Sequence, residues 1–306
     1  MRLASLCYSA LQVSGVTTLA RRLSSGGVIL CYHNVVAESG AGPAGSPGLH
    51  MPLSTFERQA RWLSATYDVV PLAAFVGRVA RGASLRGVAA VTFDDGYDGV
   101  FEHAWPLLHH LGLSATVFVV AEAPGRDEGF WWDHPEVVRH SSPDRRRHWL
   151  TALRGDSAPI VQSLAIAHPP LPHLPPRCCR PAAWQTIAEA ARSGLHLGVH
   201  SATHRSLPAL AEAELRREVV DSREVIRSRT GVRAEFFAYP YGLWNERVRR
   251  AVRSAGYQAA FTLDGGRHAA PTDPWTLPRV NVPAGIGDAA FQAWTAGLSL
   301  RRRDGS

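Results

Sequence analysis

Short apolar runs alternate with amphipathic stretches along most of the chain, and each apolar run ends at a polar or glycine-containing turn. Runs of this kind predict buried strands. They cover residues 28–32, 88–93, 115–120, 195–199, 236–239, 259–263 and 277–282. Between them the periodicity is helical, for example over residues 182–193 and 211–230. Strict alternation of strand and helix favours parallel strands joined by right-handed crossovers, and hence a doubly wound sheet or a barrel.

Three segments depart from this alternation. Residues 124–181 are rich in proline and charge, and we interpret them as an insertion over one face of the core. Residues 1–25 predict an amphipathic helix, whose buried stripe would consist of Leu3, Leu6, Ala10, Val13 and Leu23. Residues 284–306 predict a weak helix followed by a basic tail. The body of the fold is therefore expected over residues 26–283.

Chemically active residues follow the predicted strands at the points where the strands end. Asp94 and Asp95 follow the strand at 88–93, and His200 follows the strand at 195–199. His33 and Tyr241 occupy corresponding positions after two other strands. Because the carboxyl ends of parallel strands share one face of a barrel, these residues should converge there.

Asp95, His200 and His204 offer one oxygen and two nitrogens, a common ligand set for a zinc ion that keeps an open position for water. A bound divalent cation lowers the pKa of its water toward about 7 and polarises a carbonyl oxygen. Asp94 would remain free to take a proton from that water, because Gly96 allows the chain to turn both carboxylates toward one cavity. The set predicts hydrolysis of an amide or an ester.

The composition narrows the function further. The formal net charge is +7, but the sequence contains no lysine, so every basic residue other than histidine is an arginine. Missing lysine excludes Schiff-base chemistry and a phosphate loop with its lysine. No basic run carries interleaved aromatic residues, so we expect no nucleic-acid partner.

The cysteines and the apolar segments bear on location. The four cysteines lack the spacing of a zinc knuckle or redox motif, which indicates reduced thiols in a cytoplasmic protein. No stretch approaches the roughly 20 apolar residues of a membrane span. The N-terminal helix and the arginines at 301–303 could still rest on an anionic membrane, so peripheral membrane contact stays open.

Three motifs in this order resemble the polysaccharide deacetylases, the fourth family of carbohydrate esterases, also called NodB-homology proteins. They are Thr-Phe-Asp-Asp-Gly at 92–96, His-Ser-Ala-Thr-His at 200–204 and Phe-Ala-Tyr-Pro-Tyr-Gly at 237–242. The likeness extends over residues 28–283. It implies a distorted, incomplete (β/α)7–8 barrel and a divalent metal, usually zinc, on Asp95, His200 and His204. It also implies Asp94 as catalytic base and the backbone N–H of Tyr241 as a donor to the oxyanion.

Two positions depart from the family pattern. Family members often have arginine where Ala238 stands, to orient the base, and Arg279 is the candidate replacement. Many members place a histidine general acid in a Leu-x-His motif, whereas residues 277–279 read Leu-Pro-Arg. His33 could protonate the leaving amine from the opposite side, or it could make a structural hydrogen bond. If neither replacement works, turnover would be slow or absent.

The substrate is expected to be an N-acetylated glycan or amino-sugar precursor. Trp131, Trp132 and Asp133 could form a sugar-stacking platform with a polar handle, although core packing explains the two tryptophans equally well. His50 and Tyr241 are further candidates for substrate contact. The leading function is removal of an N-acetyl group. The alternatives are a deformylase or amidase acting on another small or lipid-linked amide, and a catalytically degenerate glycan-binding protein.

Overall fold

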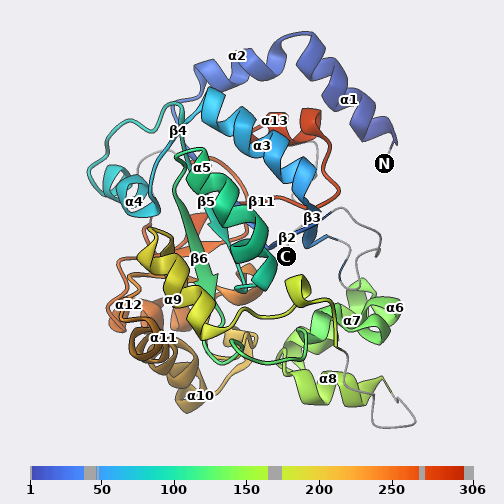
Figure 1. Ribbon diagram of the computed structural model, residues 1–306, viewed down its shortest axis with the longest axis vertical. Coiled ribbons are helices and arrows are strands. Elements are labelled where there is room, and N and C mark those ends of the chain that lie inside the picture. Colours follow the sequence, from blue (N-terminus) through green and yellow to red (C-terminus); the bar gives the residue numbers. More distant parts are fainter. Residues whose placement is uncertain (1, 38–45, 47, 165–173, 269–272, 300–306) are drawn as a thin grey trace.

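The fold is a parallel β-barrel surrounded by helices, seen in a computed structural model that describes residues 2–37, 46, 48–164, 174–268 and 273–299 (Figure 1). Its sheet has the order β10-β9-β8-β7-β6-β5-β1-β11, and every pairing in it is parallel. The strands are β1 (Val28–Tyr32), β5 (Val88–Phe93), β6 (Ala115–Val119), β7 (His196–Val199), β8 (Phe236–Ala238), β9 (Ala259–Thr262), β10 (Leu277–Pro278) and β11 (Val280–Asn281). A short strand, β4 (Asp68–Val69), pairs with the start of β5.

One extended segment joins the two ends of this sheet. Leu277 of β10 is in register with Phe261 of β9, and Val280 of β11 is in register with Leu30 of β1. Arg279 lies between the two short strands, where the segment passes from one neighbour to the other. The sheet therefore curls into a distorted barrel, which confirms the predicted fold class.

The strands form the core because nearly all of their residues are buried. Every residue of β1, β5, β6, β8 and β9 is buried, as expected for parallel strands covered on both faces. Helices surround the barrel in Figure 1. They are α3 (Leu53–Thr66), α4 (Leu72–Ala80), η1 (Val100–Ala104) with α5 (Trp105–His110), α9 (Trp184–Arg192), α10 (Glu212–Arg216), η5 (Arg217–Asp221), α11 (Ser222–Thr230), α12 (Glu246–Ser254) and α13 (Asp288–Thr295).

The segment between β6 and α9 adds small helices at one side of the barrel, at the lower right of Figure 1. They are η2 (Trp131–Asp133), α6 (Pro135–His140), α7 (Pro143–Thr151), α8 (Ser157–Ser163) and η3 (Arg177–Cys179). Residues 165–173 of this segment lie outside the described part of the chain. A small parallel pair, β2 (Asn34–Val36) with β3 (His50–Pro52), follows β1. The single turns η4 (Leu207–Ala209) and η6 (Pro240–Gly242) follow β7 and β8.

The N-terminal region forms two helices, α1 (Arg2–Val13) and α2 (Val16–Leu23), separated at Gly15, whose φ is 76°. Tyr8 and Thr17 are buried, and the Tyr8 hydroxyl accepts a 2.8 Å hydrogen bond from Nε1 of Trp294 in α13. In contrast, Leu6, Val13 and Leu23 are 67%, 89% and 69% exposed. The prediction that they form a buried stripe is therefore wrong, because the helices dock through a different face. No helix in the described residues is both long and apolar enough to cross a membrane.

Candidate active site

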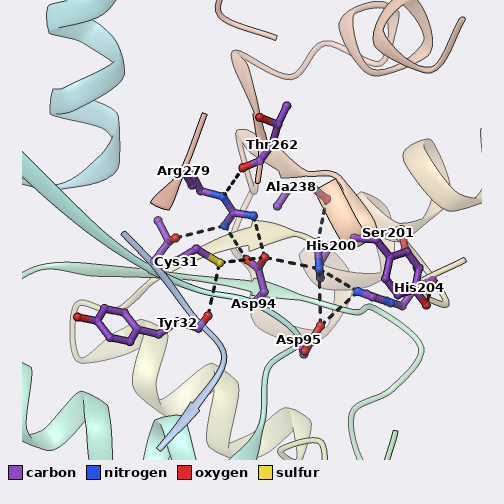
Figure 2. Close-up of polar contacts among 12 residues, drawn as sticks. Cys31, Tyr32, Asp94, Asp95, His200, Ser201, His204, Ala238, Thr262 and Arg279 are labelled. Carbon is purple, nitrogen blue, oxygen red and sulfur yellow. Dashed lines mark hydrogen bonds and ion pairs between the residues drawn. The ribbon is translucent and has the colours of Figure 1, made fainter. Parts of the chain in front are cut away.

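The turn after β5 presents two neighbouring carboxylates to the same region at the carboxyl end of the barrel (Figure 2). Asp95 has φ 72° and Gly96 has φ 82°, so two successive residues adopt the left-handed conformation. Such a φ is costly for a residue with a side chain and is common at functional sites. The turn removes the alternation that would send Asp94 and Asp95 to opposite faces of an extended strand.

Asp95, His200 and His204 converge on one point. Nε2 of His200 lies 3.1 Å from Nε2 of His204, and Oδ1 of Asp95 lies 3.6 Å and 3.4 Å from these two atoms. All three residues are buried. Oδ1 of Asp95 has no hydrogen-bond partner among the described residues. Buried polar atoms are normally paired, so this unpaired oxygen beside two imidazole nitrogens fits a cation.

The protonation of the two histidines agrees with that fit. Nδ1 of His200 donates to the carbonyl oxygen of Ala238 at 2.8 Å, which leaves Nε2 with its lone pair toward the site. Burial lowers the pKa of His200 and of His204, so both imidazoles are neutral at neutral pH. Burial and the charges of Asp94 and Asp133 raise the pKa of Asp95. A divalent cation would offset the negative charge that Asp95 carries when ionised.

Asp94 faces a different group. Nη1 and Nη2 of Arg279 each donate to one of its carboxylate oxygens at 2.7 Å (Figure 2). The thiol of Cys31 donates to Oδ2 of Asp94 at 3.3 Å, and burial raises the pKa of that thiol. Burial opposes ionisation of Asp94, but the charge and the hydrogen bonds of Arg279 outweigh it and hold the pKa of Asp94 well below its usual range. The sequence predicted Arg279 at this place but gave no indication of Cys31.

Comparison with known proteins identifies the family. The family model described as polysaccharide deacetylase matches residues 81–260, more than half of the chain. The chain belongs to the polysaccharide deacetylase family. It is thus a hydrolase of the carbohydrate esterase type, which removes N-acetyl groups from glycans by cleaving an amide bond.

Individual relatives are distant. YxkH of Bacillus subtilis (strain 168), which carries the name of the same family, is 22% identical over 268 residues, covering 87% of this chain and 75% of YxkH. The Streptococcus pyogenes deacetylase PplD, solved in complex with acetate, has a TM-score of 0.63 at 16% identity, covering 88% of this chain and 98% of PplD. IcaB from Ammonifex degensii has a TM-score of 0.62 at 20% identity, covering 89% and 98%. These two structures share the fold of this deacetylase.

A third buried carboxylate supports the loop that carries both histidines of this deacetylase. Oε2 of Glu218 accepts from the backbone N–H groups of Ala202 and Thr203 at 2.9 Å each, and Oε1 accepts from the Thr203 hydroxyl at 2.5 Å. Ser201 and His204 have φ values of 64° and 62°, so the loop needs such support.

Glu218 is a functional residue that the sequence analysis missed. It is 2% exposed and lies in η5, a π-helical turn. A signal was available, because Glu218 falls on the same helical face as Leu215, Ser222 and Ile226, which are all buried.

His33 lies beside Asp94, since Cys31, His33 and Asp94 place potential ligand atoms within 4.8 Å of one another. Burial lowers the pKa of His33 to about 4. The imidazole is therefore neutral at neutral pH. As a proton donor it would first have to take up a proton, for example the one that Asp94 removes from water.

Aromatic side chains cover the histidine side of the site. The ring centroid of Trp132 lies 4.4 Å from that of His204, and the Tyr241 ring lies 4.5 Å from His204 on an edge. The Tyr241 hydroxyl donates to the carbonyl oxygen of His204 at 3.0 Å, and the φ of Tyr241 is 59°. Trp131 packs edge-on against Trp132 and Trp149.

His50 and Asp133 differ from their expected role. Nε2 of His50 lies 3.0 Å from Oδ1 of Asp133, and both side chains are fully buried. The other oxygen of Asp133 accepts from the Tyr97 hydroxyl at 2.6 Å, which in turn accepts from Nε1 of Trp132 at 2.8 Å. Since neither side chain has exposed surface, the expectation that they touch substrate directly is corrected. Through the Tyr97 hydroxyl, this buried pair fixes the position of the Trp132 ring.

Proposed function

We propose that the chain removes an N-acetyl group from an amino sugar in a polysaccharide or a glycan precursor, with Asp94 as catalytic base. The observation that carries this proposal is that two adjacent carboxylates have opposite surroundings. Asp95 lies with two neutral imidazoles, whereas Asp94 lies with an arginine that keeps it ionised. Neighbouring groups with opposed environments are typical of acid–base assignments in active sites.

Asp95, His200 and His204 are the residues that would hold a divalent metal, zinc being the expected one. When bound, such an ion supplies a Lewis acid that polarises a carbonyl oxygen and acidifies water. The support for this assignment is the unpaired Oδ1 of Asp95 and the neutral state of the two histidines. The Ala238 carbonyl fixes the tautomer of His200, so its donor nitrogen is oriented before any ligand arrives.

Asp94 would accept the proton of the attacking water. Its low pKa keeps it ionised over the neutral range, and Arg279 and Cys31 fix the orientation of the carboxylate. The same contact bears on the alternative of a degenerate glycan-binding protein. That alternative rested partly on the missing family arginine, and Arg279 supplies a guanidinium at the base from the segment between β10 and β11.

Two further roles complete the proposal, the binding of the oxyanion and the protonation of the leaving amine. We assign the backbone N–H of Tyr241 to the oxyanion, because its left-handed turn follows β8 at the same end of the barrel as the metal ligands. We assign His33 to protonation of the leaving amine, because it lies beside Asp94 and can receive a proton from it. Trp131, Trp132 and Tyr241 would border the sugar, with Trp132 and Tyr241 nearest to His204.

The test is acetate release from N-acetylglucosamine oligosaccharides by the zinc-loaded protein. The native chain should release acetate, and Asp94→Asn should lose at least about 100-fold in rate while keeping its metal. Asp144→Asn, which changes a carboxylate that is 90% exposed, serves as the matched control. Formate release from N-formyl sugars alone would favour the deformylase alternative. Metal binding without release of either acid would contradict the proposal.

A further inference from the structure

The two N-terminal helices carry a concentration of exposed apolar side chains. Eight large apolar side chains are exposed among the described residues, and five of them lie on α1 and α2. These five are Leu6, Val13, Val16, Leu19 and Leu23, with exposed fractions of 67%, 89%, 40%, 56% and 69%. Scattered surface leucines need no explanation, but five exposed apolar side chains on two consecutive helices indicate an interaction site.

The five side chains share one side of each helix. Val16, Leu19 and Leu23 follow the i, i+3, i+7 spacing of a single helical face, and Leu6 and Val13 are seven residues apart in α1. The residues that dock the helices, Tyr8 and Thr17, lie on other faces. The helices run along the outside of the molecule, beside α13, at the top of Figure 1. The apolar face is thus turned away from the body of the protein.

The charges around this face are of one sign. Residues 1–37 contain no aspartate or glutamate. Arg21 and Arg22 lie in the last turn of α2, and Nη1 of Arg86 donates to the carbonyl oxygen of Arg22 at 2.8 Å. In the described part of the chain, none of these three arginines forms an ion pair with an acidic residue. The positive charge of these three arginines is therefore not offset by a neighbouring carboxylate.

The exposed apolar face and the neighbouring arginines together favour a lipid surface over a second copy of the chain. In a twofold contact the same patch meets itself, so the partner's α1 and α2 would bring no carboxylate to pair these arginines. An anionic bilayer offers acyl chains for the apolar face and phosphate groups for the arginines. Helices with such a composition lie in the interface of a membrane with their apolar side in the acyl boundary.

We propose that α1 and α2 form a docking surface for an anionic lipid bilayer, with Leu6, Val13, Val16, Leu19 and Leu23 in the acyl boundary and Arg22 and Arg86 at the headgroups. This inference goes beyond the proposed deacetylation and does not depend on it. Docking of α1 and α2 would hold the barrel at a membrane surface, where glycans and lipid-linked precursors are displayed.

The experiment is co-sedimentation of the full chain with vesicles of phosphatidylcholine containing about one third phosphatidylglycerol. The native chain should bind these vesicles, bind pure phosphatidylcholine much less, and dissociate as salt is raised. The combined variant Leu6→Gln, Val13→Gln and Leu19→Gln should lose about tenfold in partitioning. Arg22→Gln with Arg86→Gln should weaken binding to the anionic vesicles only.

Leu174→Gln with Val220→Gln is the matched control, because both side chains are exposed and apolar but lie outside the two helices. It should bind like the native chain. Circular dichroism of each variant shows whether the helices have formed, since all substituted apolar positions are exposed. No binding to anionic vesicles, or equal binding by the leucine–valine variant, would overturn the proposal. A dimer of the native chain that this variant converts to a monomer would overturn it in favour of a second copy.

Discussion

Arg279 donates to both carboxylate oxygens of Asp94 at 2.7 Å, from the segment that closes the barrel. The residue lies between β10 and β11, and its side chain is completely buried. Closure of the barrel and orientation of the proposed base are thus one structural feature. The arginine that the family resemblance places at Ala238, the last residue of β8, is supplied here by the segment between β10 and β11.

Arg279→Gln should move the pH dependence of the reaction. Burial raises the pKa of Asp94, and the arginine is the group that lowers this pKa most strongly. The acidic limb of the kcat/KM profile should therefore shift to higher pH, with a loss of about 100-fold at neutral pH. Stability should fall as well, because a buried carboxylate is left unpaired.

Arg279→Lys and Arg58→Gln make the result specific. The lysine keeps the positive charge but cannot donate to both carboxylate oxygens in parallel. The pH profile of Arg279→Lys should therefore shift less than that of Arg279→Gln. Arg58 pairs with Asp288 on the surface, so its loss should change neither the rate nor the profile. An unshifted acidic limb in Arg279→Gln would show that Asp94 does not control it.

Glu218→Gln should weaken metal binding without changing any ligand. A neutral amide offers one acceptor oxygen where the carboxylate now accepts three hydrogen bonds from Ala202 and Thr203, so the loop before His204 loses support. Loss of such an outer contact typically costs about 10- to 100-fold in metal affinity. Competition with a zinc-binding dye measures it.

Glu214→Gln is the control for that measurement. Glu214 lies one helical turn earlier and pairs with Arg154 and Arg205 near the surface. Its substitution should leave the zinc dissociation constant within about twofold of the native value, because Glu214 binds arginine side chains and accepts no hydrogen bond from Ala202 or Thr203. Equal losses in the two variants would indicate a general loss of stability rather than a role for Glu218 in positioning.

His268 should make the metal-free protein less stable in mild acid. Burial lowers the pKa of His268 to about 4, although the Pro278 carbonyl that it contacts at 2.7 Å acts in the opposite direction. A lowered folded pKa contributes stability that is present above the unfolded pKa of about 6.5 and is lost as the pH falls toward 4. Over that window the contribution is at most about 3 kcal/mol.

Urea unfolding of the metal-free chain between these pH values tests the prediction. His268→Gln can keep the hydrogen bond to Pro278 but does not titrate, so its stability should fall less steeply than that of the native chain. His148→Gln, at an exposed position in α7, should reproduce the native slope. Identical slopes for the native chain and His268→Gln would contradict the account.

Much of the barrel could be predicted because its strands are continuous apolar runs. The predicted strands at 28–32 and 88–93 coincide with β1 and β5, and the others agree within one residue at each end. The exception is the last strand, which is divided at Arg279. Its two halves pair with different neighbours, and a sequence pattern carries no information about which neighbour a strand selects.

The convergence of Asp95, His200 and His204 could also be predicted, since the turns that carry them follow strand ends. The contacts behind them could not. Glu218 and Cys31 act through tertiary neighbours that are distant in sequence. The prediction of a buried apolar stripe in the N-terminal helices was wrong for a related reason. Periodicity identifies the apolar face of a helix but does not say whether the protein or another surface covers it, and here Tyr8 and Thr17 make the internal contacts.

The central claim is that Asp95, His200 and His204 hold a divalent metal, and its most direct test is the metal content of the purified chain. Native protein, His204→Gln and His196→Gln would be purified without added cation, offered zinc and analysed by mass spectrometry. The last variant is the control, because His196 is exposed at the start of β7. The account predicts about one zinc per chain in the native protein and in His196→Gln, and none in His204→Gln. A native chain without zinc, or a His204→Gln variant that retains it, would contradict the claim.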